Sequence, residues 1–167
     1  GITGGLLLLN YFPGTWGEQT SENLGRHDYS LDMYGWKKAG KEFSDFYHEQ
    51  QQYHHLPDKT PLVCAFWNGC HVEYYFARPA GIPMIGVGSE QNLHQYFWMN
   101  HYRGFTTIPD TALCVMTSDV KWPGVNEYRK FYKDIQLAKV IEIKRSGKVA
   151  HYFNIYTLTG KRIDLPK

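Results

Sequence analysis

The stretch that decides the fold is LVCAFWNGCHVEYYFARPAGIPMIGV, which runs from Leu62 to Val87. It opens on a short apolar run at 62–66, passes through a helical pattern at 68–78, and ends on a second apolar run at 84–87. Pro79-Ala80-Gly81 stops the helical pattern before the second run begins. A strand, a helix and a strand in this order predict a crossover between two parallel strands.

The same alternation of helices and strands continues on both sides of this stretch. Towards the N-terminus, the spacing of apolar residues predicts a helix from about Leu31 to about Gln52, capped by Ser30 or Asp28 and with Asp32 in its first turn. Towards the C-terminus, the pattern predicts a helix from Gln91 to about His101 and a strand over 111–116. Three side chains of the second helix are expected to face inward: Leu93, Phe97 and Trp98.

The last forty residues follow a different pattern. After a short helix at 126–132, two strand-like runs at 135–145 and 149–158 flank Ser146-Gly147, a natural tight turn. We therefore predict an α/β fold: a small, mostly parallel sheet flanked by helices, with an appended C-terminal antiparallel hairpin. Residues 28–167 form one domain in this interpretation. Residues 1–27 are an entry segment, either a packed arm or edge strand, or the end of a membrane region that lies upstream.

Composition excludes several classes of protein. The 18 Lys and Arg residues against 16 Asp and Glu residues give a net charge of +2, which is too balanced for a nucleic-acid binder that relies on phosphate contacts. No window approaches the roughly 18 consecutive apolar residues of a membrane-spanning helix. The aromatic content is high, with 13 Tyr, 9 Phe and 5 Trp. These rings suit stacking on sugars, although core packing explains many of them equally well.

None of the usual catalytic or cofactor motifs is complete. The glycines in Gly86-Val87-Gly88 lack the third glycine of a dinucleotide-binding loop, the histidines lack the spacing of zinc ligands, and no G-x-S-x-G elbow occurs. We therefore assign no catalytic residue, metal or cofactor to these 167 residues. A bridge between Cys64 and Cys70 is conceivable, and an extracytoplasmic setting would permit it.

An ordered set of motifs resembles a known family. Its members are Asp32-Met33-Tyr34-Gly35-Trp36 at a helix start, Asn68 with Glu73-Tyr74-Tyr75-Phe76, Gln95-Tyr96-Phe97-Trp98, and Asp110 to Val115. In this order they resemble the soluble C-terminal domain of bacterial membrane glycosyltransferases of the dolichyl-phosphate-mannose–protein mannosyltransferase type. The lipid A aminoarabinose transferases are similar.

The resemblance implies a function for the parent protein and a limit for this chain. Enzymes of that family transfer a sugar from a polyprenyl-phosphate donor, and their catalytic acid lies in a loop between membrane helices. The resemblance therefore implies a domain without catalytic residues of its own, with no cofactor. It also implies an upstream transmembrane region of the same polypeptide as partner, and a location on the extracytoplasmic, periplasmic face of the inner membrane.

The expected role of the domain is to shape access of the acceptor, a glycan or a lipid-linked molecule. The motif residues concentrate at helix starts and strand exits, where α/β sheets bind ligands. The candidate contact residues are Tyr34, Trp36, Asn68, Glu73, Trp98 and Arg103. The alternative is a free-standing carbohydrate- or nucleotide-binding α/β domain with no membrane partner.

Overall fold

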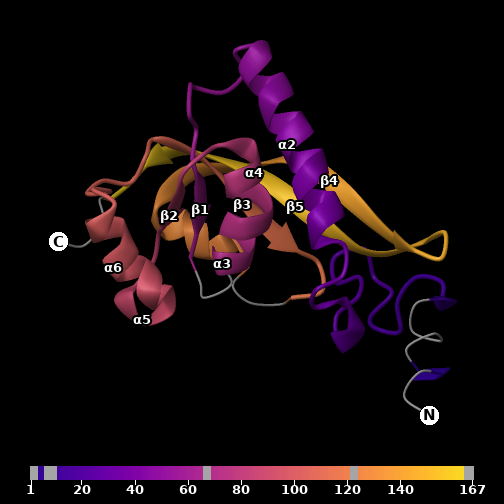
Figure 1. Ribbon diagram of the computed structural model, residues 1–167. Helices are drawn as coiled ribbons and strands as arrows, with labels where there is room; N and C mark the ends of the chain where they lie inside the picture. Colours follow the sequence, from indigo (N-terminus) through magenta and orange to yellow (C-terminus); the bar gives the residue numbers. More distant parts are fainter. Residues whose placement is uncertain (1–3, 6–10, 66–68, 121–123, 164–167) are drawn as a thin grey trace.

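A computed structural model describes residues 4–5, 11–65, 69–120 and 124–163 of the chain (Figure 1). The strands are β1 (Leu62–Cys64), β2 (Met84–Gly86), β3 (Thr111–Thr117), β4 (Tyr132–Arg145) and β5 (Lys148–Lys161). The α-helices are α2 (Trp36–Gln52), α3 (Gly69–Val72), α4 (Arg78–Ala80), α5 (Glu90–Leu93) and α6 (Gln95–Tyr102). A π-helix, η2 (Glu73–Ala77), and two 3₁₀ turns, η1 (Tyr29–Leu31) and η3 (Val125–Lys130), complete the set. The α/β class is confirmed.

The five strands form one mixed sheet in the order β2-β1-β3-β5-β4. β1 pairs in parallel with β2 and β3, while β5 pairs antiparallel with β3 and β4. The prediction of a mostly parallel sheet is wrong. β1 and β2 have only three residues each, whereas β4 and β5 have 14 each and join the sheet directly along β3. The long antiparallel hairpin therefore dominates the sheet.

The predicted hairpin is present and is longer than the sequence indicated. Its turn is Ser146-Gly147, where φ is 47° and 82°. Two consecutive positive φ values match the tight turn that suits the twist of antiparallel strands. The register of β4 against β5 shifts between Leu137 and Lys139 and again between Ile143 and Lys144. These irregularities bend the outer strand of the sheet.

The first long helix begins later than predicted. α2 starts at Trp36 because Gly35, at φ 80°, turns the chain in a left-handed conformation just before it. Tyr29–Leu31 form a separate 3₁₀ turn, and the Asp28 side chain caps that turn by accepting a hydrogen bond from the Ser30 N–H. Asp32 therefore follows the 3₁₀ turn and does not lie in the first turn of α2.

The other two predicted helices are interrupted. Residues 69–80 run as α3, η2 and α4 in succession, so the predicted helix contains a π-helical segment. Asn68, its predicted cap, lies outside the described residues. The helix predicted over 91–101 divides at His94, where φ is 48°, into α5 and α6. Leu93 is buried as predicted and Phe97 is half-buried, but Trp98 is 67% exposed, so its predicted inward orientation is wrong.

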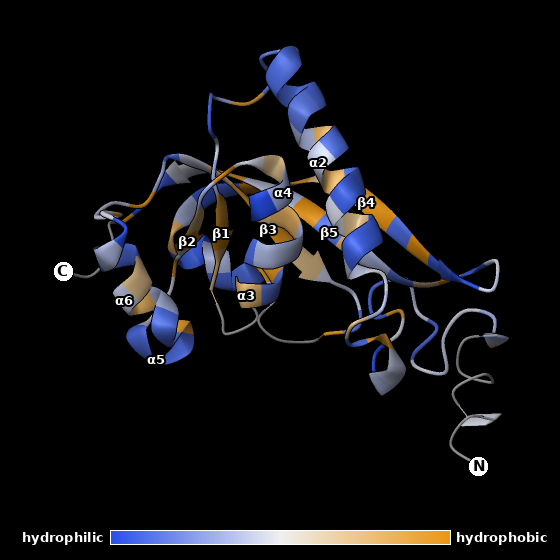
Figure 2. Cartoon of the chain, in the orientation of Figure 1, coloured by the Kyte–Doolittle hydropathy of each residue, from blue (hydrophilic) through white to orange (hydrophobic). Residues whose placement is uncertain are grey.

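Hydrophobic side chains form a cluster on each face of the sheet. Figure 2 shows that the strands are rich in hydrophobic residues. On one face α2 and the α3–η2–α4 segment lie across β1, β3 and β5 (Figure 1), with Trp36, Phe43, Phe76 and Phe153 at the centre of the packing. On the other face a smaller cluster forms around Tyr128 of η3. Within the described residues, no helix combines the length and the apolar character needed to cross a bilayer.

Candidate functional site

A cleft of about 460 Å³ lies where the N-terminal arm, residues 11–35, meets the end of β3. Asp119 and Val120 follow the carboxyl end of that strand, which is the edge where α/β sheets usually bind ligands. The arm supplies the rest of the lining: Glu18, Gly25, Arg26, His27, Asp28, Tyr29 and Asp32. Four of the lining side chains carry carboxylates: Glu18, Asp28, Asp32 and Asp119.

The innermost carboxylate, Asp28, is held by a buried arginine from the hairpin. The Arg145 Nη2 donates to Asp28 Oδ2 at 2.9 Å, and the two side chains are only 1% and 2% exposed. Thr15 Oγ1 and the Trp16 N–H donate to the same oxygen at 2.9 and 3.0 Å. The Ser30 N–H and hydroxyl donate to the other oxygen, Oδ1. Asp28 is therefore fully satisfied and has no capacity left for chemistry.

Arg145 also ties the arm to the far end of the hairpin. Its Nε donates to the Gly14 carbonyl at 2.8 Å and its Nη1 to Ser30 Oγ at 2.7 Å. Three rings surround its guanidinium, with centroids 5.8, 5.4 and 6.0 Å from Cζ for Phe12, Trp16 and Tyr34. Such cation–π contacts are strongest for desolvated cations. The arm is thus fixed against the sheet by one buried side chain.

A second buried pair joins Asp119 to His151. His151 is fully buried on β5, with Nδ1 3.2 Å from Asp119 Oδ1 and Nε2 3.0 Å from the Tyr34 carbonyl oxygen. Both partners are hydrogen-bond acceptors, and each faces one ring nitrogen. The pair resembles a catalytic dyad in composition. However, both ring nitrogens are engaged and the ring has no access to a substrate, so its role is to position Asp119.

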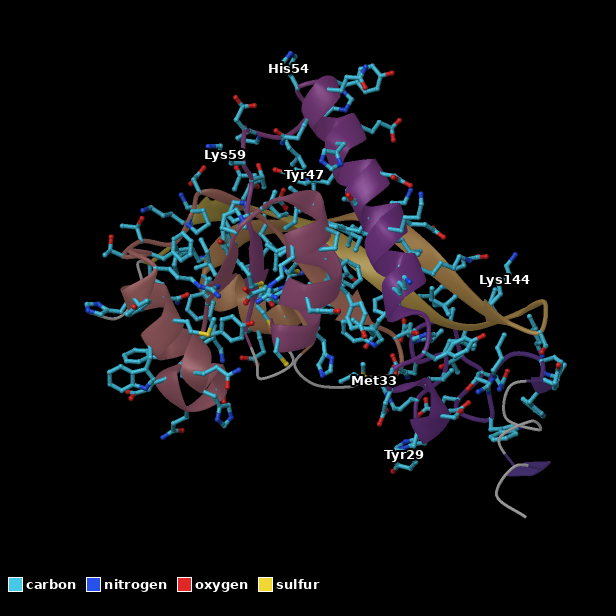
Figure 3. The ribbon with its side chains drawn as sticks, viewed as in Figure 1. Tyr29, Met33, Tyr47, His54, Lys59 and Lys144 are labelled. Carbon is cyan, nitrogen blue, oxygen red and sulfur yellow. The ribbon has the colours of Figure 1, made fainter. Side chains whose placement is uncertain are left out.

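The outer wall of the cleft is open to solvent. Tyr29 is 81% exposed, and Asp32 follows it by three residues, so the two side chains lie on one side of the 3₁₀ turn. Figure 3 shows Tyr29 and Met33 at the same end of the molecule, opposite His54. Glu18 is engaged by Arg26 at 3.8 Å and by His27 at 3.5 Å. Within the described part of the chain, no hydrogen bond or ion pair engages the Asp32 carboxylate.

Acid should weaken the fold through Asp28. Burial alone would raise the pKa of this carboxyl, but hydrogen bonds from Ser30, Trp16, Thr15 and Arg145 lower it to about 2. Because its pKa is lower in the folded state, Asp28 stabilises the fold at pH values above its pKa in the unfolded chain, about 3.9. This contribution to stability is lost as pH falls from about 4 towards 2.

The measurement is urea unfolding at several pH values between 5 and about 2.5, with wild type compared with Asp28→Asn. The difference in free energy of unfolding between the two proteins should be largest at the highest pH and should shrink as pH falls. Other carboxylates titrate in both proteins and cancel in this difference. A difference that stays constant with pH would contradict the assignment.

Two of the sequence-predicted contact residues, Glu73 and Arg103, meet away from the cleft. Arg103 Nη2 lies 2.9 Å from Glu73 Oε1, and the Tyr96 hydroxyl donates to Glu73 Oε2 at 2.8 Å. Burial acts to raise the pKa of Glu73, but the bonds from Arg103 and Tyr96 outweigh it and lower that pKa. Arg78 adds a weaker contact at 3.8 Å. The cluster joins η2 to α6, so the charged side chains of Glu73 and Arg103 have a structural role.

The other predicted contact residues lie apart from one another. Tyr34 is half-buried, and its hydroxyl donates to the Lys144 carbonyl at 3.2 Å. Trp36 is buried in the core, and its Nε1 donates to the Asp32 carbonyl at 2.8 Å. Trp98 projects from α6 into solvent, and Asn68 lies outside the described residues. Tyr34 contacts the groups behind the cleft through its carbonyl and its ring, and Trp36 contacts the cleft residue Asp32 through its indole N–H.

The cleft residues themselves were missed by the sequence reasoning. Asp119 had one usable signal, since it follows the predicted strand 111–116 at its carboxyl end. Nothing in the sequence indicated that Asp28 and Arg145 are in contact, because 117 residues separate them in the chain. The three cysteines are thiols, with Cys64 and Cys114 buried and Cys70 exposed, so the conceivable bridge is not formed. Among the described residues, no group of three or more His, Cys, Asp or Glu side chains is placed to hold a metal ion.

We compared the chain with protein-family models, with curated proteins and with solved structures, and none of the three comparisons finds a match.

Proposed function

We propose that this chain is a soluble, non-catalytic domain of a membrane glycosyltransferase that uses a polyprenyl-phosphate sugar donor, and that its cleft shapes access of the acceptor. In this proposal the domain lies on the extracytoplasmic, periplasmic side of the membrane and is tethered through an upstream transmembrane region. The acceptor is a glycan or a lipid-linked saccharide. No cofactor is assigned to the domain.

The observation that carries the proposal is the pairing of Tyr29 and Asp32 on the rim of the cleft. An exposed aromatic ring offers a flat face to the C–H groups of a sugar, and a carboxylate without a partner in the described chain accepts bonds from sugar hydroxyls. The inner carboxylates, Asp28 and Asp119, are already held by Arg145 and His151. This arrangement favours binding at the rim.

The first test is binding, followed by amide chemical shifts in a ¹⁵N-labelled chain. Probes are neutral disaccharides and, separately, a short water-soluble polyprenyl phosphate such as geranyl phosphate. We expect saturable shifts at residues 26–32 and 118–120 with the saccharides. Asp32→Asn should weaken binding about tenfold, since a hydrogen bond to a charged group contributes roughly 1.5 kcal/mol. Tyr29→Ala should also weaken binding, because it removes the aromatic face on which the sugar stacks.

The matched controls are Asp58→Asn and Tyr53→Ala, which alter an exposed acid and an exposed tyrosine that follow α2 and do not line the cleft. Neither control should change saccharide affinity. Shifts that spread evenly over the surface, or no shifts at all, would remove the support for an acceptor site here.

The alternative, a free-standing carbohydrate- or nucleotide-binding domain, uses the same cleft without a membrane partner. The complete reading frame distinguishes the two, because a transferase requires several hundred upstream residues with many hydrophobic segments. In a transferase assay of the complete polypeptide, Asp32→Asn should raise KM for the acceptor and leave KM for the polyprenyl donor unchanged. An equal effect on both substrates would argue against acceptor shaping.

A further inference from the structure

A second hollow of about 640 Å³ lies between α2 and the π-helical segment. α2 lines it with Lys37, Lys41 and Asp45, which recur at the spacing of one helix face. Tyr74 and Tyr75 of η2 line the opposite side, with Pro79 next to them. This groove lies apart from the acceptor cleft and shares no lining residue with it.

The groove exists because the two helices cross at very short range. Gly40 faces η2, and a Cβ atom at this position would lie 1.9 Å from the Tyr75 carbonyl oxygen. In the π-helical turn the Arg78 N–H donates to the Glu73 carbonyl, five residues back, which inserts an extra residue into the helix. π-Helical insertions of this kind occur frequently at functional sites. Here the insertion lies directly beside Tyr74 and Tyr75.

A column of aromatic rings holds Tyr74 in place from the core outward. Phe153 packs edge-on against Trp36 at 5.0 Å, Trp36 contacts Tyr75 at 5.9 Å, and Tyr75 meets Tyr74 at 4.9 Å and 85°. Three of these four rings are buried or half-buried, but Tyr74 is 61% exposed. Its ring is therefore positioned by the core while one side of it stays open. Such pre-organisation lowers the entropic cost of binding.

Lysine side chains supply positive charge on the opposite side of the groove. Lys41 pairs with Asp45 at 2.8 Å and is largely neutralised by it. Lys37, one turn earlier on the same face, is exposed, and no ion pair or hydrogen bond to another described residue engages it. The groove therefore combines the flat aromatic face of Tyr74, the available ammonium group of Lys37 and the carboxylate of Asp45, which can accept hydrogen bonds from hydroxyl groups.

We infer that this groove binds an anionic saccharide, a pyranose that carries a carboxylate or a phosphate group. The sugar ring stacks on Tyr74, and its anionic group pairs with Lys37. The C–H face of a pyranose complements an aromatic ring, and the charge complements an ammonium that has no counter-ion in the described fold. The inference stands independently of the acceptor cleft, because the residues of the two sites do not overlap.

The test is titration of the ¹⁵N-labelled chain with glucuronic acid and with glucose 1-phosphate at about 20 mM salt, with glucose as the neutral control. We expect localised shifts at residues 37–45 and 74–79 with both anions, and weaker affinity for glucose. Comparing the two anions distinguishes a carboxylate-bearing from a phosphate-bearing sugar. Raising the salt to about 0.5 M should weaken binding of the anions, because exposed charges are screened at that ionic strength.

Variants then separate stacking from charge. Tyr74→Ala should lower affinity about fivefold for anionic and neutral sugars alike, whereas Lys37→Gln should lower it about threefold for the anions only. Lys38→Gln is the matched control, since Lys38 is a neighbouring exposed lysine of α2 that does not line the groove and pairs with Glu42 at 3.7 Å. The three side chains changed here are exposed, so unfolding is not expected.

Three outcomes overturn the inference: no saturable binding of either anion up to tens of millimolar, equal affinity for glucose and the anions, or binding that neither Tyr74→Ala nor Lys37→Gln weakens. Shifts confined to residues 26–32 and 118–120 would support the acceptor cleft and refute the groove. Shifts confined to the groove would support the groove, while the cleft is tested by its own titration with neutral disaccharides. The two proposals therefore fail separately.

Discussion

Replacing Arg145 with methionine is expected to destabilise the folded chain by about 3–5 kcal/mol, the cost of removing one partner from a buried ion pair. The pair in question joins Arg145 of β4 to Asp28 of the arm, and both side chains are almost fully buried. Methionine fills much of the space of the arginine but leaves the Asp28 carboxylate without its counter-charge. The desolvation cost of that carboxylate then remains uncompensated.

The loss of stability should be large because the Arg145 side chain has three hydrogen-bond partners and three aromatic neighbours. It donates to the carboxylate, to the Gly14 carbonyl and to the Ser30 hydroxyl, and it packs against three aromatic rings. The adjacent Lys144 cannot replace it, since that side chain is exposed on the opposite face of β4. We therefore expect the arm to detach before the sheet unfolds.

Urea unfolding followed by tryptophan fluorescence measures the effect, because Trp16 lies against the guanidinium. Lys144→Met is the matched control and should change stability by less than about 0.5 kcal/mol, as surface substitutions usually do. The double variant Arg145→Met with Asp28→Asn should be less destabilised than the sum of the single variants, since the unpaired charge is gone. A loss below about 1 kcal/mol for Arg145→Met would show that the pair is dispensable.

The strands were predictable from the sequence but their partners were not. The apolar runs at 62–66, 84–87 and 111–116 indicate buried strands, and β1, β2 and β3 form there. Periodicity identifies a strand and says nothing about the direction of its neighbour, because both kinds of ladder bury the same side chains. The insertion of β5 beside β3 was therefore missed, although the hairpin turn at Ser146-Gly147 was found from its residues alone.

The candidate cleft was beyond sequence reasoning for a related reason. Its geometry depends on contacts between the arm and the hairpin, such as the Asp28–Arg145 pair, whose members are 117 residues apart. Local signals detect helix caps and turns, and Asp28 was predicted as a possible cap of the long helix, but it caps the preceding 3₁₀ turn instead. The same signals do not show that a cap is also the buried partner of a distant arginine. Trp98 was predicted to face inward but is exposed, because the buried residues of α6 are Tyr96 and Asn100.

The π-helical segment was also missed by the sequence reasoning. The sequence 69–80 has an ordinary helical pattern, but Pro79 has no N–H to donate to the carbonyl of Tyr75, four residues back, and its ring crowds that carbonyl in a regular α-helix. In the structure the Tyr75 carbonyl points at Gly40 of α2, and the two backbones approach more closely than any side chain would allow. The position of Tyr74 and Tyr75, and hence the proposed saccharide groove, depends on that one glycine.

Gly40→Ala is accordingly expected to destabilise the fold by about 2 kcal/mol or more. Two effects oppose each other here. Alanine is the better helix former, by roughly 1 kcal/mol, so the substitution would stabilise an isolated α2. The added methyl group, however, would lie 1.9 Å from the Tyr75 carbonyl oxygen, far inside van der Waals contact, and backbone atoms cannot move aside as a flexible side chain can. Overpacking of this kind costs roughly 1–3 kcal/mol and occasionally more.

Whether Gly40→Ala raises or lowers the free energy of unfolding shows which of the two effects is larger. Urea unfolding of Gly40→Ala is compared with Ser44→Ala, one turn later on α2, where a Cβ is already present and the change should stay within about 0.5 kcal/mol. A stabilised Gly40→Ala would mean that α2 and η2 are not in contact as described. A destabilised variant that still folds should also lose saccharide-induced shifts at Tyr74, because separating the helices moves one side of the groove away from Lys37.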